Sequence, residues 1–135
     1  MTLVVDTCIL LDILDEDPVF GLKSARALNA QQGNDLVVSP VTYVELAPAF
    51  LGDRRLQDQF LDGLGIHVVS DEPGVLNAAH DAWNAHVSRK RKGREARRPI
   101  ADVFIGALAS VHEGLVTRNA KDFRALFPSL AIFEP

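Results

Sequence analysis

The chain has 135 residues, of which 47% are hydrophobic and 24% are charged, and its formal net charge is −4. This composition excludes a disordered chain and fits one domain spanning residues 1–135. No apolar run reaches the ~20 residues of a membrane span, no leader peptide is recognisable, and a single cysteine excludes a disulfide framework. We therefore expect a cytoplasmic protein without a membrane partner.

Short apolar runs alternate with amphipathic stretches in the first half of the chain. Ser39 and Pro40 suit the N-cap and the first position of a helix, and Pro48 comes late enough to kink that helix rather than prevent it. The predicted elements are a strand at 3–6, helices at 7–14 and 19–31, a strand at 36–39, and helices at 41–51 and 54–64.

The second half continues this alternation. We expect a strand at 66–69, a helix at 75–87, a basic segment at 89–98, an apolar helix at 100–111, a strand at 115–117, a short helix at 122–126 and a strand at 130–133. Strands that alternate with helices predict an α/β fold with three α/β/α layers around a mainly parallel sheet of four to five strands. In such sheets the functional crevice lies outside the carboxyl ends of the strands.

Asp102 is the anomaly in the predicted apolar helix. It stands in the first turn of a segment that is otherwise almost wholly apolar and is therefore expected to be buried on most sides. An ionised carboxylate without partners costs several kcal/mol or more to bury. Asp102 should therefore be protonated, paired or holding a cation.

Other polar oxygens fall at the same predicted edge of the sheet. Asp6 closes the first strand, and Glu45 lies in the helix after the second strand. Asn119 and Asp122 follow the fourth strand. Carboxylates that converge in this way repel one another unless a divalent cation lies among them. Oxygen ligands without paired Cys or His favour Mg²⁺ or Mn²⁺ over zinc.

The basic segment indicates a polyanionic partner. Residues 89–98 hold seven of the 14 Lys and Arg but one of the 18 Asp and Glu, so the segment carries +6 and the remainder of the chain −10. A solvated loop or a docking site for an acidic partner would have the same composition. The residues predicted to contact a phosphate backbone are Arg89, Lys90, Arg91, Lys92, Arg94, Arg97 and Arg98.

A divalent metal beside a segment that grips a phosphate backbone predicts hydrolysis of a phosphodiester bond. Such a metal lowers the pKa of a bound water and stabilises charge on a phosphoryl oxygen. Water is the expected nucleophile, since no serine, cysteine or histidine is placed to serve.

Four stretches of the sequence resemble, in order, the acidic motifs of PIN domains. They are LVVDTCILLD at 3–12, VTYVEL at 41–46, IADVFIGALA at 100–109 and LVTRNAKDF at 115–123. The closing FPSLAIFEP is similar to the ends of small bacterial members. The resemblance covers essentially the whole chain and is strongest to the VapC toxins of type II toxin–antitoxin pairs.

This resemblance implies a Mg²⁺- or Mn²⁺-dependent endoribonuclease, usually a homodimer, that is silenced by a cognate antitoxin protein. It also implies that Asp6, Glu45 and Asp102 are the catalytic, metal-binding acids. Many members have Asp where this chain has Asn119, and others have an acid at the position of Asp122. We favour Asp122 as the fourth catalytic acid, with Asn119 as a possible neutral ligand.

Each of these acids also has a simpler interpretation. Asp6 could cap the helix that starts at residue 7, and Glu45 could lie on a helix surface. Asp102 could interact with the helix dipole or pair with Arg98. Asp122 could cap the short helix that contains it.

The alternative function is a non-catalytic PIN-like module that binds RNA or a protein, and Asn119 in place of an acid favours it. Cys8 stands where Ser or Asn is more usual, and we expect it to be a small buried hydrophobe. Asp12 is expected to be a solvated acid at a helix end, and His80 and His86 are expected at the surface.

Overall fold

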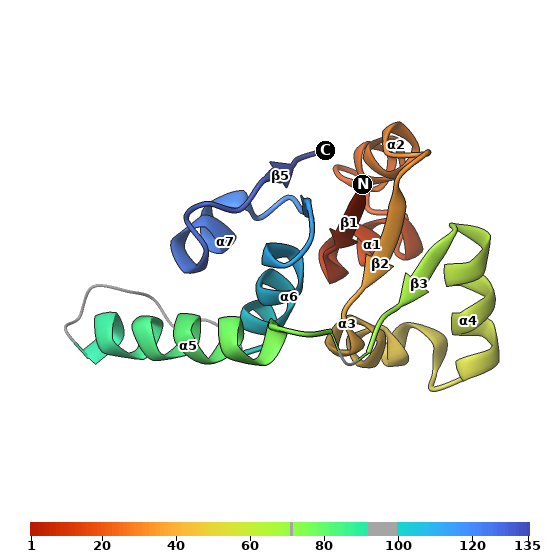
Figure 1. Ribbon diagram of the computed structural model, residues 1–135. Coiled ribbons are helices and arrows are strands. Elements are labelled where there is room, and N and C mark those ends of the chain that lie inside the picture. The colour runs from red at the N-terminus through yellow and green to blue at the C-terminus, as the bar shows by residue number, and fades with distance from the viewer. Residues whose placement is uncertain (71, 92–99) are drawn as a thin grey trace.

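The computed structural model describes residues 1–70, 72–91 and 100–135. Its strands form a five-stranded, entirely parallel sheet in the order β3-β2-β1-β4-β5 (Figure 1). The strands are β1 (Thr2–Val5), β2 (Asp35–Val38), β3 (Ile66–Val68), β4 (Gly114–Val116) and β5 (Ile132–Phe133). The first strand of the chain is thus the central strand, and the predicted α/β fold with a parallel sheet is confirmed.

Helices cover both faces of this sheet. They are α1 (Thr7–Leu14), α2 (Gly21–Ala30), α3 (Pro40–Glu45), α4 (Arg54–Gly63), α5 (Val75–Arg91), α6 (Ile100–Ser110) and α7 (Ala120–Leu126). Side chains of α1, α2 and α4 share a core with Leu3 and Val5, whereas α6 and α7 pack against Val4 on the opposite face. Successive strand residues point to opposite faces, so an apolar strand such as β1 must be covered on both. The predicted three-layer arrangement is confirmed.

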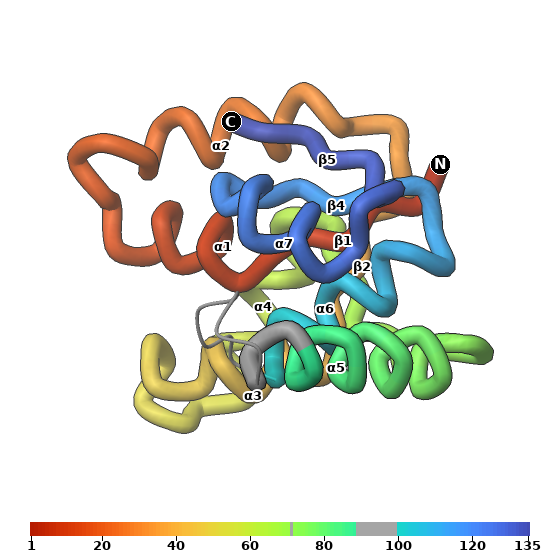
Figure 2. Tube along the Cα trace, turned by 90° about the vertical axis from the view of Figure 1, so that its left-hand side faces the viewer, coloured from red at the N-terminus to blue at the C-terminus, as the bar shows by residue number. Residues whose placement is uncertain are grey.

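The longest of these helices, α5, packs on α6 rather than on the sheet. α6 contacts β1 and β4, and a cluster that includes Ala79, Ala82, Val103 and Ala107 joins α5 to α6. Figure 2 shows α6 between α5 and the strands, and in Figure 1 the end of α5 extends beyond the rest of the fold. In the described part of the chain, no helix combines the length and the apolar character of a membrane-crossing helix.

The other predicted helices are reproduced to within two residues at each end, and two helices differ more in extent from the prediction. The helix after β2 ends at Glu45 and is followed by a 3₁₀ helix, η1 (Ala47–Phe50), so Pro48 does not kink one continuous helix. Proline has no N–H to continue the i−4 hydrogen-bond ladder, and a short 3₁₀ turn accommodates it. α5 continues past residue 87 to Arg91. Ser39 caps α3 as predicted, and its hydroxyl accepts a 3.2 Å hydrogen bond from the Val41 N–H.

Candidate active site

Three neighbouring strands end with polar residues at the carboxyl edge of the sheet. Asp6 follows β1, Ser39 follows β2 and Thr117 follows β4. Asp6 occupies the N-cap position of α1, yet its side chain makes no capping hydrogen bond. The interpretation of Asp6 as a plain helix cap therefore does not hold, and its carboxylate points to other partners.

The carboxylate of Asp6 is almost completely buried, with 4% of the residue exposed. Its Oδ2 accepts hydrogen bonds from the Thr117 hydroxyl at 2.7 Å and from the Cys8 thiol at 3.2 Å. Burial raises the pKa of Asp6 above its ordinary value. The two side-chain hydrogen bonds oppose this rise, and a backbone hydrogen bond at Thr7 and the positive charge of Arg118 oppose it further. The ionised form of Asp6 therefore has a desolvation cost that its hydrogen bonds offset only in part. A cation bound nearby would stabilise this buried charge.

Thr117 is the residue at this edge that the sequence analysis missed. It is fully buried, and its hydroxyl donates to Asp6 while accepting a 3.0 Å hydrogen bond from the backbone N–H of Asn119. Because the single hydroxyl proton is committed to Asp6, Thr117 is held in one orientation. The available signal was a threonine directly after an apolar strand, within the stretch that also holds Asn119.

Cys8 is a hydrogen-bond donor to the site rather than the purely hydrophobic residue we expected. Its thiol is partly buried, donates to Asp6 and lies 3.7 Å from the Thr117 hydroxyl. Burial, followed by the negative charge of Asp6, raises the pKa of Cys8 to about 12. The thiol therefore stays protonated at neutral pH and is unsuited to act as a nucleophile.

Glu45 is connected to the end of β1 through Thr7. The Thr7 hydroxyl donates a 2.7 Å hydrogen bond to Oε1 of Glu45, and Oγ1 of Thr7 also lies 2.9 Å from Oγ1 of the buried Thr42. Thr7 is the first residue of α1 and directly follows Asp6. Glu45 is itself exposed, so its carboxylate borders both solvent and the start of α1.

The other predicted oxygen ligands lie at the starts of two helices. Asp102 and Asp122 are partly buried in the first turns of α6 and α7. Asn119 occupies the N-cap position of α7, and its side chain makes no capping hydrogen bond. α6 leads to the start of β4 and α7 follows its end, so in a parallel sheet both first turns face the carboxyl edge.

The structure nevertheless does not gather all the predicted acids into one compact group. Across residues 1–70, 72–91 and 100–135, no three His, Cys, Asp or Glu side chains form a cluster that could hold a metal ion. What the structure brings together is Asp6 with Thr117 and Cys8, and Glu45 with Thr7.

The predicted RNA-binding segment lies mostly beyond the described structure. The backbone of Arg89, Lys90 and Arg91 completes α5, but their side chains are not described. The other members, Lys92, Arg94, Arg97 and Arg98, lie outside the described residues altogether.

Two residues expected at the surface are buried. Asp12 is 4% exposed because α2 packs against α1 and covers it, and Ser24 of α2 donates a 2.9 Å hydrogen bond to its carboxylate. His86 is 2% exposed, with its ring 5.7 Å from that of Trp83. His80 is exposed, as predicted.

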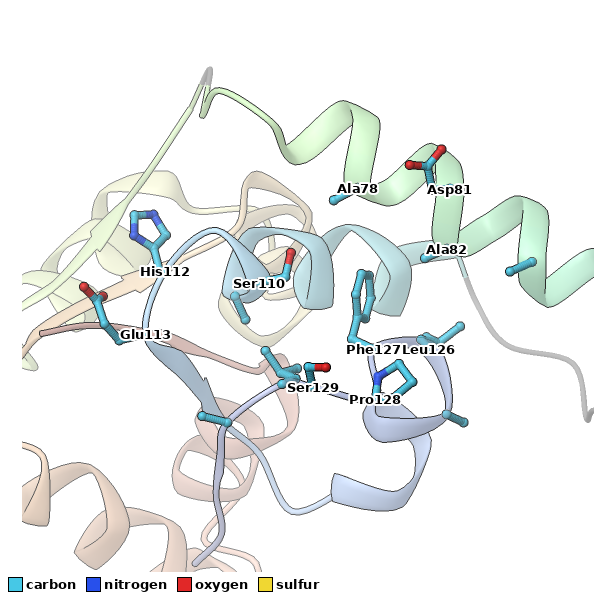
Figure 3. Close-up of a pocket in the computed structure, with 15 residues that line it drawn as sticks. Ala78, Asp81, Ala82, Ser110, His112, Glu113, Leu126, Phe127, Pro128 and Ser129 are labelled. Carbon is cyan, nitrogen blue, oxygen red and sulfur yellow. The ribbon is translucent and has the colours of Figure 1, made fainter.

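A hollow of about 630 Å³ lies at the far end of α6 (Figure 3). Ala78 and Ala82 of α5, Ser110 at the end of α6, and Phe127 and Pro128 after α7 contribute to its walls. α6 runs from the carboxyl edge of the sheet back to the start of β4, so this hollow is at the edge opposite to the buried carboxylate after β1. It is not part of the candidate active site.

Comparison with solved structures shows which known proteins share this architecture. VapBC-1 from nontypeable Haemophilus influenzae has a TM-score of 0.72 and 19% identity over 99% of this chain and 98% of that chain. VapBC2 from Rickettsia felis, bound to a promoter DNA fragment, has a TM-score of 0.70 and 17% identity over 99% and 98%. A toxin–antitoxin complex from Klebsiella pneumoniae has a TM-score of 0.64 and 20% identity over 89% and 88%. These likenesses establish a shared fold.

A search of curated proteins found no match to the sequence. A comparison with protein-family models did find one, and it agrees with the structural comparison. Residues 3–126 match the PIN domain, a span that includes β1 except for its first residue, the whole of β2, β3 and β4, and every helix described above. The chain therefore belongs to the PIN domain family.

Proposed function

We propose that this protein is a metal-dependent endoribonuclease that hydrolyses RNA phosphodiester bonds with water as the nucleophile. The observation that carries the proposal is Asp6, a carboxylate buried at the carboxyl end of the central parallel strand, where burial opposes its ionisation. Buried charges in proteins are usually paired or coordinate metals. Ligand and active sites of open α/β sheets also lie at this edge.

The donors at this edge suit Mg²⁺ or Mn²⁺. We propose that Asp6, Glu45 and Asp102 hold the ion, with Asp122 as a fourth catalytic acid or Asn119 as a neutral ligand. Mg²⁺ is typically held by one or two carboxylates together with waters and substrate phosphates, so the lack of a three-acid cluster among the described residues is compatible with it. When bound, such an ion supplies a water of lowered pKa and neutralises charge on a phosphoryl oxygen.

The chain's own residues orient the acids, and neither Cys8 nor Thr117 is suited to act as a nucleophile. Thr117 and Cys8 hold Oδ2 of Asp6, and Thr7 holds Oε1 of Glu45. The thiol of Cys8 stays protonated, because its pKa is raised to about 12. The Thr117 hydroxyl is buried, and its proton is committed to the hydrogen bond with Oδ2 of Asp6. These contacts support attack by water and argue against a covalent enzyme intermediate.

We further propose that the protein is the toxin of a toxin–antitoxin pair, acts in the cytoplasm as a homodimer, and is silenced by a cognate antitoxin. The similarity to a toxin–antitoxin complex from Klebsiella pneumoniae supports this proposal. The basic residues 89–98 are the proposed RNA contact, since phosphate binding needs clustered Lys and Arg.

The test is cleavage of RNA by the purified chain, freed of any partner. Substrates labelled at either end, incubated with Mg²⁺, Mn²⁺ or a chelator, distinguish internal cleavage from trimming. Asp6→Asn and Asp102→Asn should abolish the metal-dependent products, and Asp62→Asn, an exposed acid on α4, should not. If the wild type yields no metal-dependent products beyond those of Asp102→Asn, the enzymatic proposal is wrong.

The second candidate is a PIN-like module that binds RNA or a protein without cleaving it. It is favoured by Asn119 in place of an acid and by the absence of a three-acid cluster in the described part of the chain. Metal-independent RNA binding by a chain that produces no cleavage, with or without Mn²⁺, would support this candidate over the first.

A further inference from the structure

Arg118 and Asp12 form an ion pair that is enclosed between α1, α2 and the turn after β4. Nε of Arg118 donates to Oδ2 of Asp12 at 2.9 Å, and Nη2 donates to Oδ1 at 3.2 Å. Ser24 adds a third hydrogen bond to the same carboxylate at 2.9 Å. Only 4% of the Asp12 side chain and 33% of the Arg118 side chain are exposed. The pair is therefore a two-pronged contact in which the carboxylate is buried and the arginine side chain still reaches solvent.

An aromatic ring covers one face of the Arg118 guanidinium. Cζ of Arg118 lies 4.5 Å from the ring centroid of Phe20, which precedes α2. The flat guanidinium is thus held at its edge by a carboxylate and on its face by a ring, a combination that a lysine ammonium cannot reproduce. The position of the Arg118 side chain is determined by two different elements, α1 and the start of α2.

The backbone of Arg118 belongs to the turn that orients the buried carboxylate of the site. Thr117, one residue earlier, donates to Asp6, and Asn119, one residue later, donates its N–H to the Thr117 hydroxyl. Asp6 precedes the helix α1, and Asp12 lies within the same helix. The turn 117–119 is therefore joined to α1 twice, by the hydroxyl at the start of the helix and by the guanidinium further along it.

We propose that Arg118 is a positioning residue, which acts through Thr117 to hold Asp6 in its catalytic orientation. The inference rests on the proposed role of Asp6 as a catalytic carboxylate. The clamp formed by Asp12, Phe20 and Arg118 restrains the turn 117–119. The restrained turn keeps the Thr117 hydroxyl within hydrogen-bond distance of Oδ2 of Asp6.

The competing explanation is that the ion pair only stabilises the packing of α1 and α2 against β4. Both explanations expect variants to lose stability. They differ in what happens to the turn in molecules that remain folded. Under the positioning role, the turn 117–119 loosens locally. Under a purely stabilising role, it opens only together with the whole sheet.

The test compares wild type with Arg118→Lys. Lysine preserves the positive charge beside Asp12 but cannot form the two-pronged hydrogen bond to Asp12 or stack on Phe20 in the same way. Arg124→Lys is the matched control, because Arg124 is an exposed cation of the neighbouring helix α7 with a 4.0 Å surface contact to Glu134. Asp12→Asn combined with Arg118→Gln provides a neutral pair should a lone substitution fail to fold. All variants are measured as the full chain under conditions where circular dichroism shows a folded protein.

The first readout is amide hydrogen exchange in the metal-free protein. The Asn119 N–H reports on the turn because its acceptor is the Thr117 hydroxyl. The Leu115 N–H, bonded to the Ala131 carbonyl at 3.0 Å, reports on opening of the sheet. We expect Arg118→Lys to accelerate exchange at Asn119 by about tenfold or more relative to Leu115, and Arg124→Lys to leave that ratio unchanged.

The second readout is the kinetics of RNA cleavage with Mn²⁺. Arg118→Lys should lower kcat by about tenfold or more with little change in KM, because a misplaced carboxylate affects the chemical step. If KM rises and kcat does not change, Arg118 contacts the substrate and the positioning role is wrong. It is equally wrong if stability falls while the exchange ratio and kcat both match those of Arg124→Lys.

The two proposals fail in distinguishable ways. A wild-type protein that cleaves no RNA overturns the proposed function, whereas the hydrogen-exchange ratio still decides the clamp. An unchanged ratio in both Arg118→Lys and the neutral pair overturns the clamp, whatever the activity of the wild type.

Discussion

Thr117 donates a 2.7 Å hydrogen bond to Oδ2 of Asp6 and so joins the ends of two neighbouring parallel strands, β4 and β1. Both residues are buried, and they lie 111 positions apart in the sequence. The contact gives a poorly solvated carboxylate one fixed donor at the edge where open α/β sheets place their active sites. The stability and the chemistry of this edge should therefore depend on the hydroxyl of Thr117.

Replacing Thr117 with valine should lower both stability and activity. Valine has the same shape but leaves Oδ2 of Asp6 with one donor fewer and the Asn119 N–H without its acceptor. We expect the free energy of unfolding in urea to fall by about 1–3 kcal/mol, the range for unsatisfied buried polar groups. Thr117→Ser keeps the hydroxyl and should retain most of the activity. Equal activity of the valine and serine variants would contradict an orienting role for the hydroxyl.

Asp6→Asn should inactivate the protein while making the metal-free form more stable. Asparagine keeps an oxygen that can accept from Thr117 and Cys8 but removes the buried charge whose burial raises the pKa of Asp6. We expect a gain in the free energy of unfolding at neutral pH, because a group whose pKa is raised on folding lowers stability when it is ionised. A clear loss of stability would contradict the conclusion that burial of the ionised Asp6 carboxylate destabilises the metal-free protein.

The same substitution should have a characteristic pH dependence. Because the pKa of Asp6 is raised above its ordinary 3.8 on folding, the folded state binds more protons than the unfolded state between these two values. The wild type therefore loses stability, relative to Asp6→Asn, as pH rises through that window. Below the unfolded pKa both states are protonated, so the two proteins should converge. Urea titrations from acidic to neutral pH check this, and a difference that does not shrink at acidic pH would contradict it.

The thiol of Cys8 should be nearly inert in the native protein. With a pKa of about 12, its thiolate fraction at pH 8 is roughly three orders of magnitude below that of a free cysteine. Iodoacetamide should label the native chain correspondingly slowly and the urea-unfolded chain at the ordinary rate. Asp6→Asn removes one of the causes of the raised pKa, so it should speed native labelling. A labelling rate that is independent of residue 6 would show that shielding alone protects the thiol.

Gly106→Ala should destabilise the packing of α6 against the segment after α7. A Cβ at Gly106 would come within 2.5 Å of the Phe127 ring and 3.3 Å of the Phe123 ring. We expect a loss of about 1–3 kcal/mol, the usual effect of overpacking, and partial recovery when Phe127→Leu is added. Gly63→Ala, at the last position of α4, is the control, because nothing lies within 4 Å of a Cβ there. Equal effects at the two glycines would refute the close contact.

Much of the fold could be predicted from the order of short apolar runs and amphipathic stretches. Strands such as Leu3-Val-Val are buried on both faces, and such strands read as continuous apolar runs that local sequence reveals. The apolar segment that starts at Ile100 likewise forms a helix with a buried core side. The prediction that Pro48 would kink a continuous helix was wrong, because the chain forms a separate 3₁₀ helix at this position. Local helix propensity does not determine which of the two forms.

For the candidate site, the sequence by itself determined that Asp6 follows an apolar strand and that Asp102 begins an apolar helix, since both facts are local. Only the tertiary structure decided that Thr117 and Cys8 hold Asp6. It also decided that Asp12, expected in solvent, is buried against Arg118, a residue 106 positions away. The physical reason is that the periodicity of apolar residues indicates which face of a helix or strand is suited to burial. The partner that covers it depends on contacts between elements far apart in the chain.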